Sequence, residues 1–269
     1  MRFAHITPIP LLNAVLSDDN TFHLCISDLV LDNPVYTAFY RNRKARGDYI
    51  IMDSPAFETG LPADLKDTLH AEGLLQPHEV VLPDDLTSAD NTIKLSTDTR
   101  NALLRAGYNG MFMAVPHGRT LEEYINCTKE LLEGCSSPLR GMPVIGIQEE
   151  IPELYGISRN EMMQRLRLEY AQHSTRHVQF HLLGIGEKLE ELTDPDVRCL
   201  ARSSDTAKFV VYGLNGISVS PWSASQTLPA YPGRDSVGGR TGYFHYRTDS
   251  AVAITTARLN ATNWNEFEV

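Results

Sequence analysis

Eight short apolar runs, separated by longer polar or amphipathic stretches, restrict the fold of this chain more than any other feature. The runs cover residues 3–9, 22–31, 49–53, 79–83, 110–115, 143–147, 178–183 and 198–204. Runs of this length, bounded by turn residues, are typical of buried strands, and most of the gaps between them are long enough for helices. Alternating strands and helices build parallel sheets, so the sequence predicts an α/β protein with a (β/α)8 TIM-like barrel.

Two of the gaps begin with a helix-start signal. Thr120 with Glu123, and Ser158 with Glu161, have the spacing of a capping box, and an apolar stripe at helical spacing follows each pair. We therefore expect helices to begin at these two places and to pack against the strands.

The composition changes near residue 218. From there the chain is rich in Ser, Pro, Gly and aromatic residues. The sequence thus predicts a barrel domain over 1–217 and an irregular C-terminal appendage over 218–269, packed on the barrel, with a mobile loop near Gly233 to Thr241.

Charge and cysteine content exclude several classes of protein. The chain has 269 residues and a net charge of −10, so any contact with a nucleic acid must be local. Its four cysteines lack zinc or disulfide spacing, and no metal or cofactor is expected. No signal peptide or membrane span is expected either. The predicted location is the cytoplasm, or the host cytoplasm if the protein is viral.

Polar and reactive residues recur where the expected strands end, which is where barrel enzymes place their active sites. Each also has a structural interpretation, as a turn residue, a helix cap or a solvated charge. The segments are Asp53-Ser54 with Phe57, Asp84-Asp85, Pro116-His117-Gly118, Gln148-Glu149-Glu150, Gly184-Ile185-Gly186-Glu187 and Ser203-Ser204-Asp205-Thr206.

The order of these segments resembles a known family. MDSPAF, LPDD, AVPHG, VIGIQEE, HLLGIGE and SSDTA follow one another between Tyr49 and Thr206. This order is similar to that of the tRNA-guanine transglycosylases, and most similar to their DNA-acting branch, which places 7-deazaguanines in viral and bacterial DNA. The motifs are short, so the specificity of the resemblance comes from their order and spacing.

The resemblance implies two catalytic aspartates. Asp205 would be the nucleophile that attacks the anomeric carbon of the sugar and displaces guanine, and Asp53 would be the general acid and base. The residue types suit this chemistry: one carboxylate captures the sugar covalently, and a second handles the proton.

The same resemblance implies a set of base contacts. Phe57 would stack on the base, with Ser54 of the same motif beside it, and either Asp84 or Asp85 would recognise the guanine edge. A second group of expected base contacts consists of His117 and Gly118, which stand where the family usually has Gln-Gly, and of Gly146, Glu149 and Gly184.

One departure from the family favours DNA as the substrate. The tRNA enzymes are longer and carry a Cys-rich zinc site after the last strand, whereas no cysteine follows Asp205 here. The leading hypothesis is exchange of guanine in DNA for a 7-deazaguanine, such as the cyano (preQ0) or aminomethyl (preQ1) form. The alternatives are the same exchange on tRNA, an N-glycosidase or nucleosidase, and a non-catalytic binding barrel.

Two basic stretches are candidates for phosphate contacts. They comprise Arg41, Arg43, Lys44 and Arg46, and in the C-terminal region Arg234 and Arg240, where aromatic residues are interleaved. Solvated loops are the alternative explanation. The expected partners are DNA, or tRNA as the alternative, and a 7-deazaguanine base. A homodimer is the assembly considered.

Overall fold

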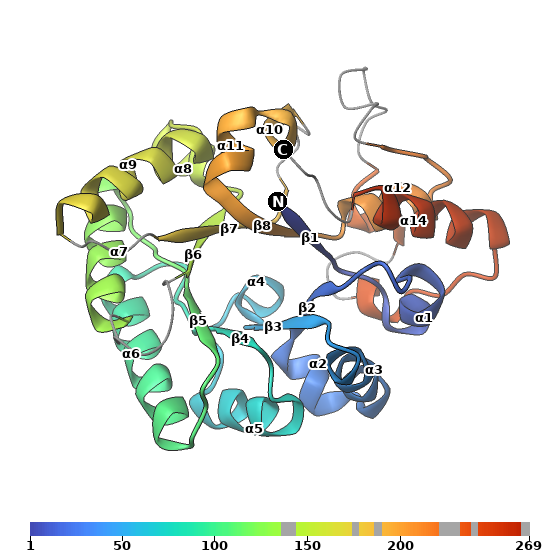
Figure 1. The fold of residues 1–269 in the computed structure, drawn as a ribbon, viewed down its shortest axis with the longest axis horizontal. Coiled ribbons are helices and arrows are strands. Elements are labelled where there is room, and N and C mark those ends of the chain that lie inside the picture. Colours follow the sequence, from blue (N-terminus) through green and yellow to red (C-terminus); the bar gives the residue numbers. More distant parts are fainter. Residues whose placement is uncertain (136–143, 174–177, 186–189, 221–231, 238–241, 265–269) are drawn as a thin grey trace.

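The chain forms a ring of eight parallel strands surrounded by helices (Figure 1). The computed structural model describes residues 1–135, 144–173, 178–185, 190–220, 232–237 and 242–264. The strands are β1 (Arg2–His5), β2 (Phe22–Ile26), β3 (Tyr49–Asp53), β4 (Glu79–Val81), β5 (Met111–Ala114), β6 (Val144–Gln148), β7 (Gln179–Leu183) and β8 (Ala201–Thr206).

The strands follow the order of the sequence around the ring, β1 pairs with β8, and the one ladder missing among the described strands is between β1 and β2. The hydrogen-bonded order is β1-β8-β7-β6-β5-β4-β3-β2, and every pair is parallel. β1 and β2 stand at the two ends of this order and lie next to each other, so the sheet is a nearly closed barrel. The predicted (β/α)8 architecture is confirmed.

Helices cover the outside of the barrel. They are α1 (Leu12–Val15), α2 (Ser27–Asp32), α3 (Pro34–Ala45), α4 (Ala56–Thr59), α5 (Leu65–Leu75), α6 (Ala89–Arg105), α7 (Leu121–Cys135), α8 (Ile151–Tyr155), α9 (Arg159–His173), α10 (Glu190–Thr193), α11 (Pro195–Leu200), α12 (Lys208–Leu214) and α14 (Ala251–Asn263), with short 3-10 helices η1 (Ile9–Leu11), η3 (Arg234–Val237) and η4 (Tyr243–His245). Among the helices in the described ranges, none has both the length and the apolar composition needed to cross a bilayer.

All eight expected strands are present, and three of them have an end that differs from the expected one by three or more residues. The first ends at His5, since Pro8 precedes η1. The second stops at Ile26, and the remaining apolar residues of that run form α2, because an apolar run alone does not separate a strand from a buried helix. The eighth begins only at Ala201, because the first residues of the expected strand belong to α11. Asp194 caps the start of that helix, and its side chain accepts a hydrogen bond from the Asp196 amide (2.8 Å).

The two predicted capping boxes are half formed. The hydroxyls of Thr120 and Ser158 each accept a hydrogen bond from the amide three residues later, both at 3.1 Å. In a complete capping box the Glu side chain would accept a hydrogen bond from the amide of the capping residue. The Glu123 carboxylate instead accepts one from the Arg119 amide (2.8 Å). The helices therefore begin close to where the sequence predicts, with one of the two capping contacts.

The chain beyond residue 217 contributes α14, which packs against α12 and α1 (Figure 1). Asn260 of α14 is fully buried and joins three segments: its amide nitrogen donates to the carbonyls of Phe209 (3.0 Å) and Ile217 (2.9 Å), and its oxygen accepts from the Val219 amide (2.9 Å). Of the loop expected near Gly233 to Thr241, residues 234–237 form η3, and 238–241 lie outside the described residues.

Asn260→Ala is expected to lower the free energy of unfolding by roughly 2–4 kcal/mol, because three hydrogen bonds are lost and buried backbone groups are left unpaired. Asn263→Ala, at an exposed position of the same helix, should change stability by less than about 0.5 kcal/mol. Urea unfolding of both variants measures this, and equal effects would show that α14 is not held through Asn260.

Candidate active site

A cavity of about 560 Å³ opens at the carboxyl ends of the strands. Every strand contributes to its wall, either with its last residues or with the loop that follows. The contributions run in chain order through Ile6, Ile26, Asp53, Asp84, His117, Gln148, Gly184 and Asp205. The barrel therefore gathers at one end the segments that are scattered along the sequence.

Asp53 and Asp205, the two predicted catalytic residues, both line this cavity. The pKa of Asp53 is raised well above its ordinary value, first by burial and then by the negative charges of Asp205, Glu58 and Asp84. A hydrogen bond from the Ser54 amide to Asp53 Oδ1 (2.8 Å) opposes this shift without cancelling it. Asp53 thus has an environment that favours its protonated, neutral form.

Asp205 has a different environment. Its Oδ1 accepts a hydrogen bond from the Gly184 amide (3.2 Å) and lies 3.2 Å from Nε2 of His181. Oδ2 accepts no hydrogen bond from any described residue. Donors on one oxygen stabilise a carboxylate anion and leave the other oxygen available for chemistry.

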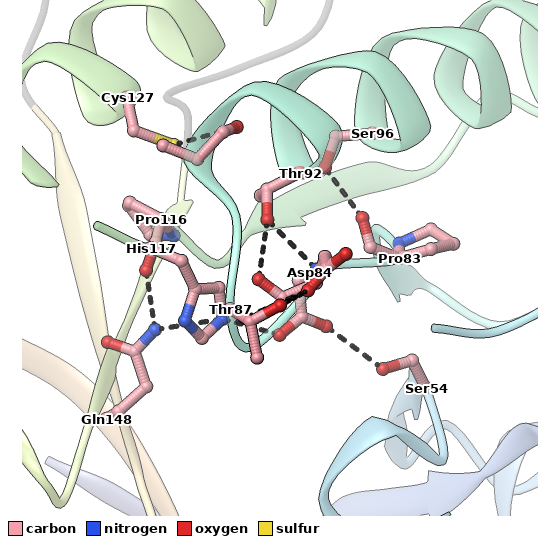
Figure 2. Close-up of polar contacts among 12 residues, drawn as sticks. Ser54, Pro83, Asp84, Thr87, Thr92, Ser96, Pro116, His117, Cys127 and Gln148 are labelled. Carbon is pink, nitrogen blue, oxygen red and sulfur yellow. Dashed lines mark hydrogen bonds and ion pairs between the residues drawn. The ribbon is translucent and has the colours of Figure 1, made fainter. Parts of the chain in front are cut away.

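A polar network on the opposite side of the cavity centres on Asp84, which is 4% exposed (Figure 2). Asp84 Oδ2 lies 2.7 Å from His117 Nε2, and Asp84 Oδ1 accepts a hydrogen bond from the Ser54 hydroxyl (3.3 Å). Gln148 donates to the Pro116 carbonyl (2.6 Å) beside His117. This arrangement presents a carboxylate, an imidazole, a hydroxyl and an amide to a planar polar ligand.

Asp85, the other carboxylate considered for the base contact, does not belong to this network and does not line the cavity. Its carboxylate accepts hydrogen bonds from the amide and hydroxyl of Thr87 (2.9 and 2.7 Å) and from Asn91 (2.7 Å). It is therefore the turn cap that the structural interpretation predicted, and Asp84 is the residue that faces the cavity.

Two of the three predicted glycines act through packing and do not line the cavity. A Cβ on Gly118 would lie 2.4 Å from the Tyr124 amide nitrogen, and one on Gly146 would lie 2.7 Å from Leu183 Cδ1. Gly184 does line the cavity; its φ of +67° favours glycine, and a Cβ there would lie 2.8 Å from Glu149 Oε2.

Phe57 and Glu149 complete the predicted set inside the cavity. Phe57 lines the cavity and is 39% exposed. The pKa of Glu149 is raised, mainly by burial and then by the charge of Glu150, with a smaller contribution from Asp205. The cavity therefore contains a second carboxyl group that is held closer to neutrality than usual.

The basic stretch before β3 lies away from the cavity, at the other end of the barrel. Arg43 is buried and donates to the backbone carbonyls of Leu16 (2.6 Å) and Ser17 (3.0 Å), so its expected phosphate contact is not available. Arg46 pairs with Asp18 (2.8 Å), which precedes β2. Arg41 and Lys44 lie in the same last turns of α3. Of the second stretch, the side chain of Arg234 and all of Arg240 lie outside the described residues, as do Gly186 and Glu187.

Three residues near the site were not predicted. His181 and Gln148 face the interior because they alternate with Leu182 and Ile147, which point to the other face of their strands; this signal is available in the sequence. Arg159 is buried and donates to the Gly184 carbonyl (2.9 Å) while it pairs with Glu191. No sequence pattern predicts the contact between Arg159 and the Gly184 carbonyl. In the described ranges, no group of three or more His, Cys, Asp or Glu side chains is placed to hold a metal ion.

Asp53→Asn is expected to become increasingly stable relative to the wild type as the pH rises above about 4. Unfolded Asp53 ionises near pH 3.9, whereas in the folded state its pKa is higher. The unfolded state therefore loses the proton first, and the stability of the wild type falls with rising pH until the folded pKa is passed. Asn removes this loss.

Asp85→Asn is the matched control, with the opposite sign. Hydrogen bonds from Asn91 and Thr87 lower the pKa of Asp85, so its stabilising effect is present above the ordinary pKa of Asp and is lost on acidification. Denaturant unfolding between about pH 3 and pH 8 measures both variants. A constant difference between Asp53→Asn and wild type would show that Asp53 is ionised in the folded state.

Comparison with known proteins adds little to this geometry. The chain matches no protein-family model and no curated protein. Among solved structures it is similar to a D-psicose 3-epimerase from Clostridium cellulolyticum H10, crystallised with D-tagatose. The identity is 8%, the TM-score is 0.45, and the match covers 97% of this chain and 96% of that chain. A similarity at this level says nothing about substrate or mechanism.

Proposed function

We propose that this protein is an enzyme, a pentosyltransferase that exchanges guanine in DNA for a 7-deazaguanine base. The observation that carries the proposal is the unlike environment of two aspartates in one cavity. Burial and neighbouring charge favour a protonated Asp53, while the Gly184 amide donates to one oxygen of Asp205 and the His181 ring contacts the same oxygen. An acid and a nucleophile are the two groups that base exchange requires.

The exchange proceeds through two displacements at the sugar. Asp205 Oδ2 attacks C1′ of the deoxyribose, the C1′–N9 bond breaks, and guanine leaves with the proton that Asp53 donates. The incoming 7-deazaguanine then attacks C1′, gives its N9 proton to the Asp53 carboxylate, and releases Asp205. Each displacement inverts the sugar carbon, so the product keeps the original configuration.

The polar network supports a purine as the ligand. The Asp84 carboxylate can accept hydrogen bonds from the N–H groups on the pyrimidine edge of guanine, and Ser54 and His117 hold it in place. The cavity volume, about 560 Å³, lies within the usual range for small-molecule sites. A single base with its sugar is therefore a ligand of suitable size and chemistry.

Apolar side chains at the mouth support a polymeric substrate. Phe57, Leu86 and Leu154 line the cavity and are 39%, 46% and 61% exposed. Exposed apolar groups around a single-base site suit a flipped nucleotide whose neighbours need new stacking partners. The choice of DNA over tRNA comes from the order of the sequence motifs, which is most similar to that of the DNA-acting branch.

A base-release assay tests the proposed function. The protein is incubated with duplex DNA, single-stranded DNA or tRNA that carries labelled guanine, together with cyano- or aminomethyl-7-deazaguanine. Release of label from DNA that requires the added base supports the proposal. Release of label from tRNA alone would assign tRNA as the substrate instead of DNA, and release without an added base would indicate an N-glycosidase. No release from duplex DNA, single-stranded DNA or tRNA would overturn the proposal.

Asp205→Asn is expected to abolish the covalent protein–DNA adduct and to lower exchange by at least ~10³-fold, because the amide is a poor nucleophile. Asp53→Asn should lower turnover by roughly 10²–10⁴-fold with little effect on DNA binding. Denaturing gels run without the incoming base detect the adduct. Asp85→Asn, with the same chemical change outside the cavity, should form the adduct normally. An adduct in Asp205→Asn would assign the nucleophile elsewhere.

A further inference from the structure

A continuous chain of buried side chains runs through the barrel from its amino end to Asp205. At the amino end, Tyr49 donates to Glu79 Oε2 (2.7 Å), and Arg202 binds both oxygens of the fully buried Glu79 (2.9 and 3.1 Å). The chain then continues through the Ser203 hydroxyl, which accepts a hydrogen bond from Arg202 Nε (3.1 Å). Ser203 Oγ lies 2.8 Å from Nδ1 of His181, and Nε2 of the same ring lies 3.2 Å from Asp205 Oδ1.

A bulge in β8 makes this chain possible. Phe180 of β7 pairs with Ala201, but the next residue, His181, pairs with Ser203, so Arg202 is an extra residue in β8. Consecutive residues of a regular strand point to opposite faces, whereas a bulge brings two neighbours to the same side. Arg202 and Ser203 can therefore touch each other, and Asp205, two residues after Ser203, faces the cavity.

The direction of each hydrogen bond in the chain is fixed from the arginine outward. Arginine is always charged and can only donate, so Ser203 Oγ accepts from Arg202. Ser203 is 0% exposed, and His181 Nδ1 is the acceptor that the described residues offer for its hydroxyl hydrogen. A buried hydroxyl left without an acceptor is costly. His181 Nδ1 therefore accepts, its proton lies on Nε2, and that N–H points at Asp205.

We propose that Arg202 and Ser203 are positioning residues that hold His181 in its neutral Nε2–H tautomer, so that Asp205 is kept as an anion with Oδ2 available to attack. This inference rests on the proposed function for the role of Asp205. The other tautomer would turn a lone pair of His181 toward the carboxylate, and Asp205 would then need a proton of its own to keep the contact. A protonated Asp205 is not a nucleophile.

The tautomer can be measured directly, without substrate. Nitrogen-15 NMR of histidine-labelled protein distinguishes protonated from unprotonated ring nitrogens, and His181→Gln identifies the His181 signals. The expected result is a proton on Nε2 and none on Nδ1 in the wild type. Ser203→Ala should lose this single tautomer, and Ser203→Thr, which keeps the hydroxyl, should retain it. A wild-type Nδ1–H, or an unchanged tautomer in Ser203→Ala, overturns the inference.

Ser204→Ala is the matched control. Ser204 is equally buried on the same strand, but its hydroxyl donates to the Leu182 carbonyl (2.9 Å) and takes no part in the chain. The rate of base exchange should fall by at least ~10-fold in Ser203→Ala, and the fall should be in kcat and not in KM. In Ser204→Ala the rate should change by less than about twofold. Circular dichroism checks the fold, and the tautomer of the wild type carries the test if Ser203→Ala does not fold.

The two readouts separate the failure of this inference from that of the proposed function. A correct tautomer together with no base release from DNA or tRNA would leave the hydrogen-bond chain in place and remove base exchange. Base release with the tautomer reversed would leave the exchange in place and remove the positioning role of Arg202 and Ser203.

Discussion

Two carboxyl groups line one cavity, and the negative charge of Asp205 helps to raise the pKa of Asp53; the rest of the site is arranged around this repulsion. Asp205 accepts a hydrogen bond from the Gly184 amide and contacts the His181 ring. At Asp53, burial and three acidic neighbours raise the pKa, and a single amide hydrogen bond opposes them. The protein thus separates two chemically identical side chains by their surroundings. This difference in surroundings is what the proposed division between acid and nucleophile depends on.

The regular barrel determines where the two aspartates lie, and its irregular segments determine how their surroundings differ. Regular strands bring Asp53 and Asp205 to the same end, because all carboxyl termini of a parallel ring point one way. The bulge at Arg202 and the positive φ of Gly184 then determine what surrounds Asp205. Such features carry a conformational cost, and they are found where function requires an exact orientation.

The sequence predicts the barrel and the cavity aspartates well, because both follow from local patterns. Apolar runs mark the strands, and Asp53, Asp84 and Asp205 lie at or just beyond the carboxyl ends of β3, β4 and β8. Other features depend on contacts that no local pattern encodes. Asp85 differs from Asp84 only through its loop partners. Arg43 is basic in sequence, yet it is buried beside Leu16. The bulge at Arg202 depends on the pairing of two strands, so the hydrogen-bond chain could not be foreseen.

The pairing of the first strand has a consequence for how the chain is made. β1 forms its ladder with β8, from Arg2 opposite Ser203 to His5 opposite Thr206, and has no ladder with β2. During synthesis at about 5–20 residues per second, the partner of β1 leaves the ribosome roughly 10–40 s later. Throughout that interval β1 has unpaired edges that can bind other nascent chains. Expression in cells should therefore depend on chaperones more strongly than the stability of the finished barrel would suggest.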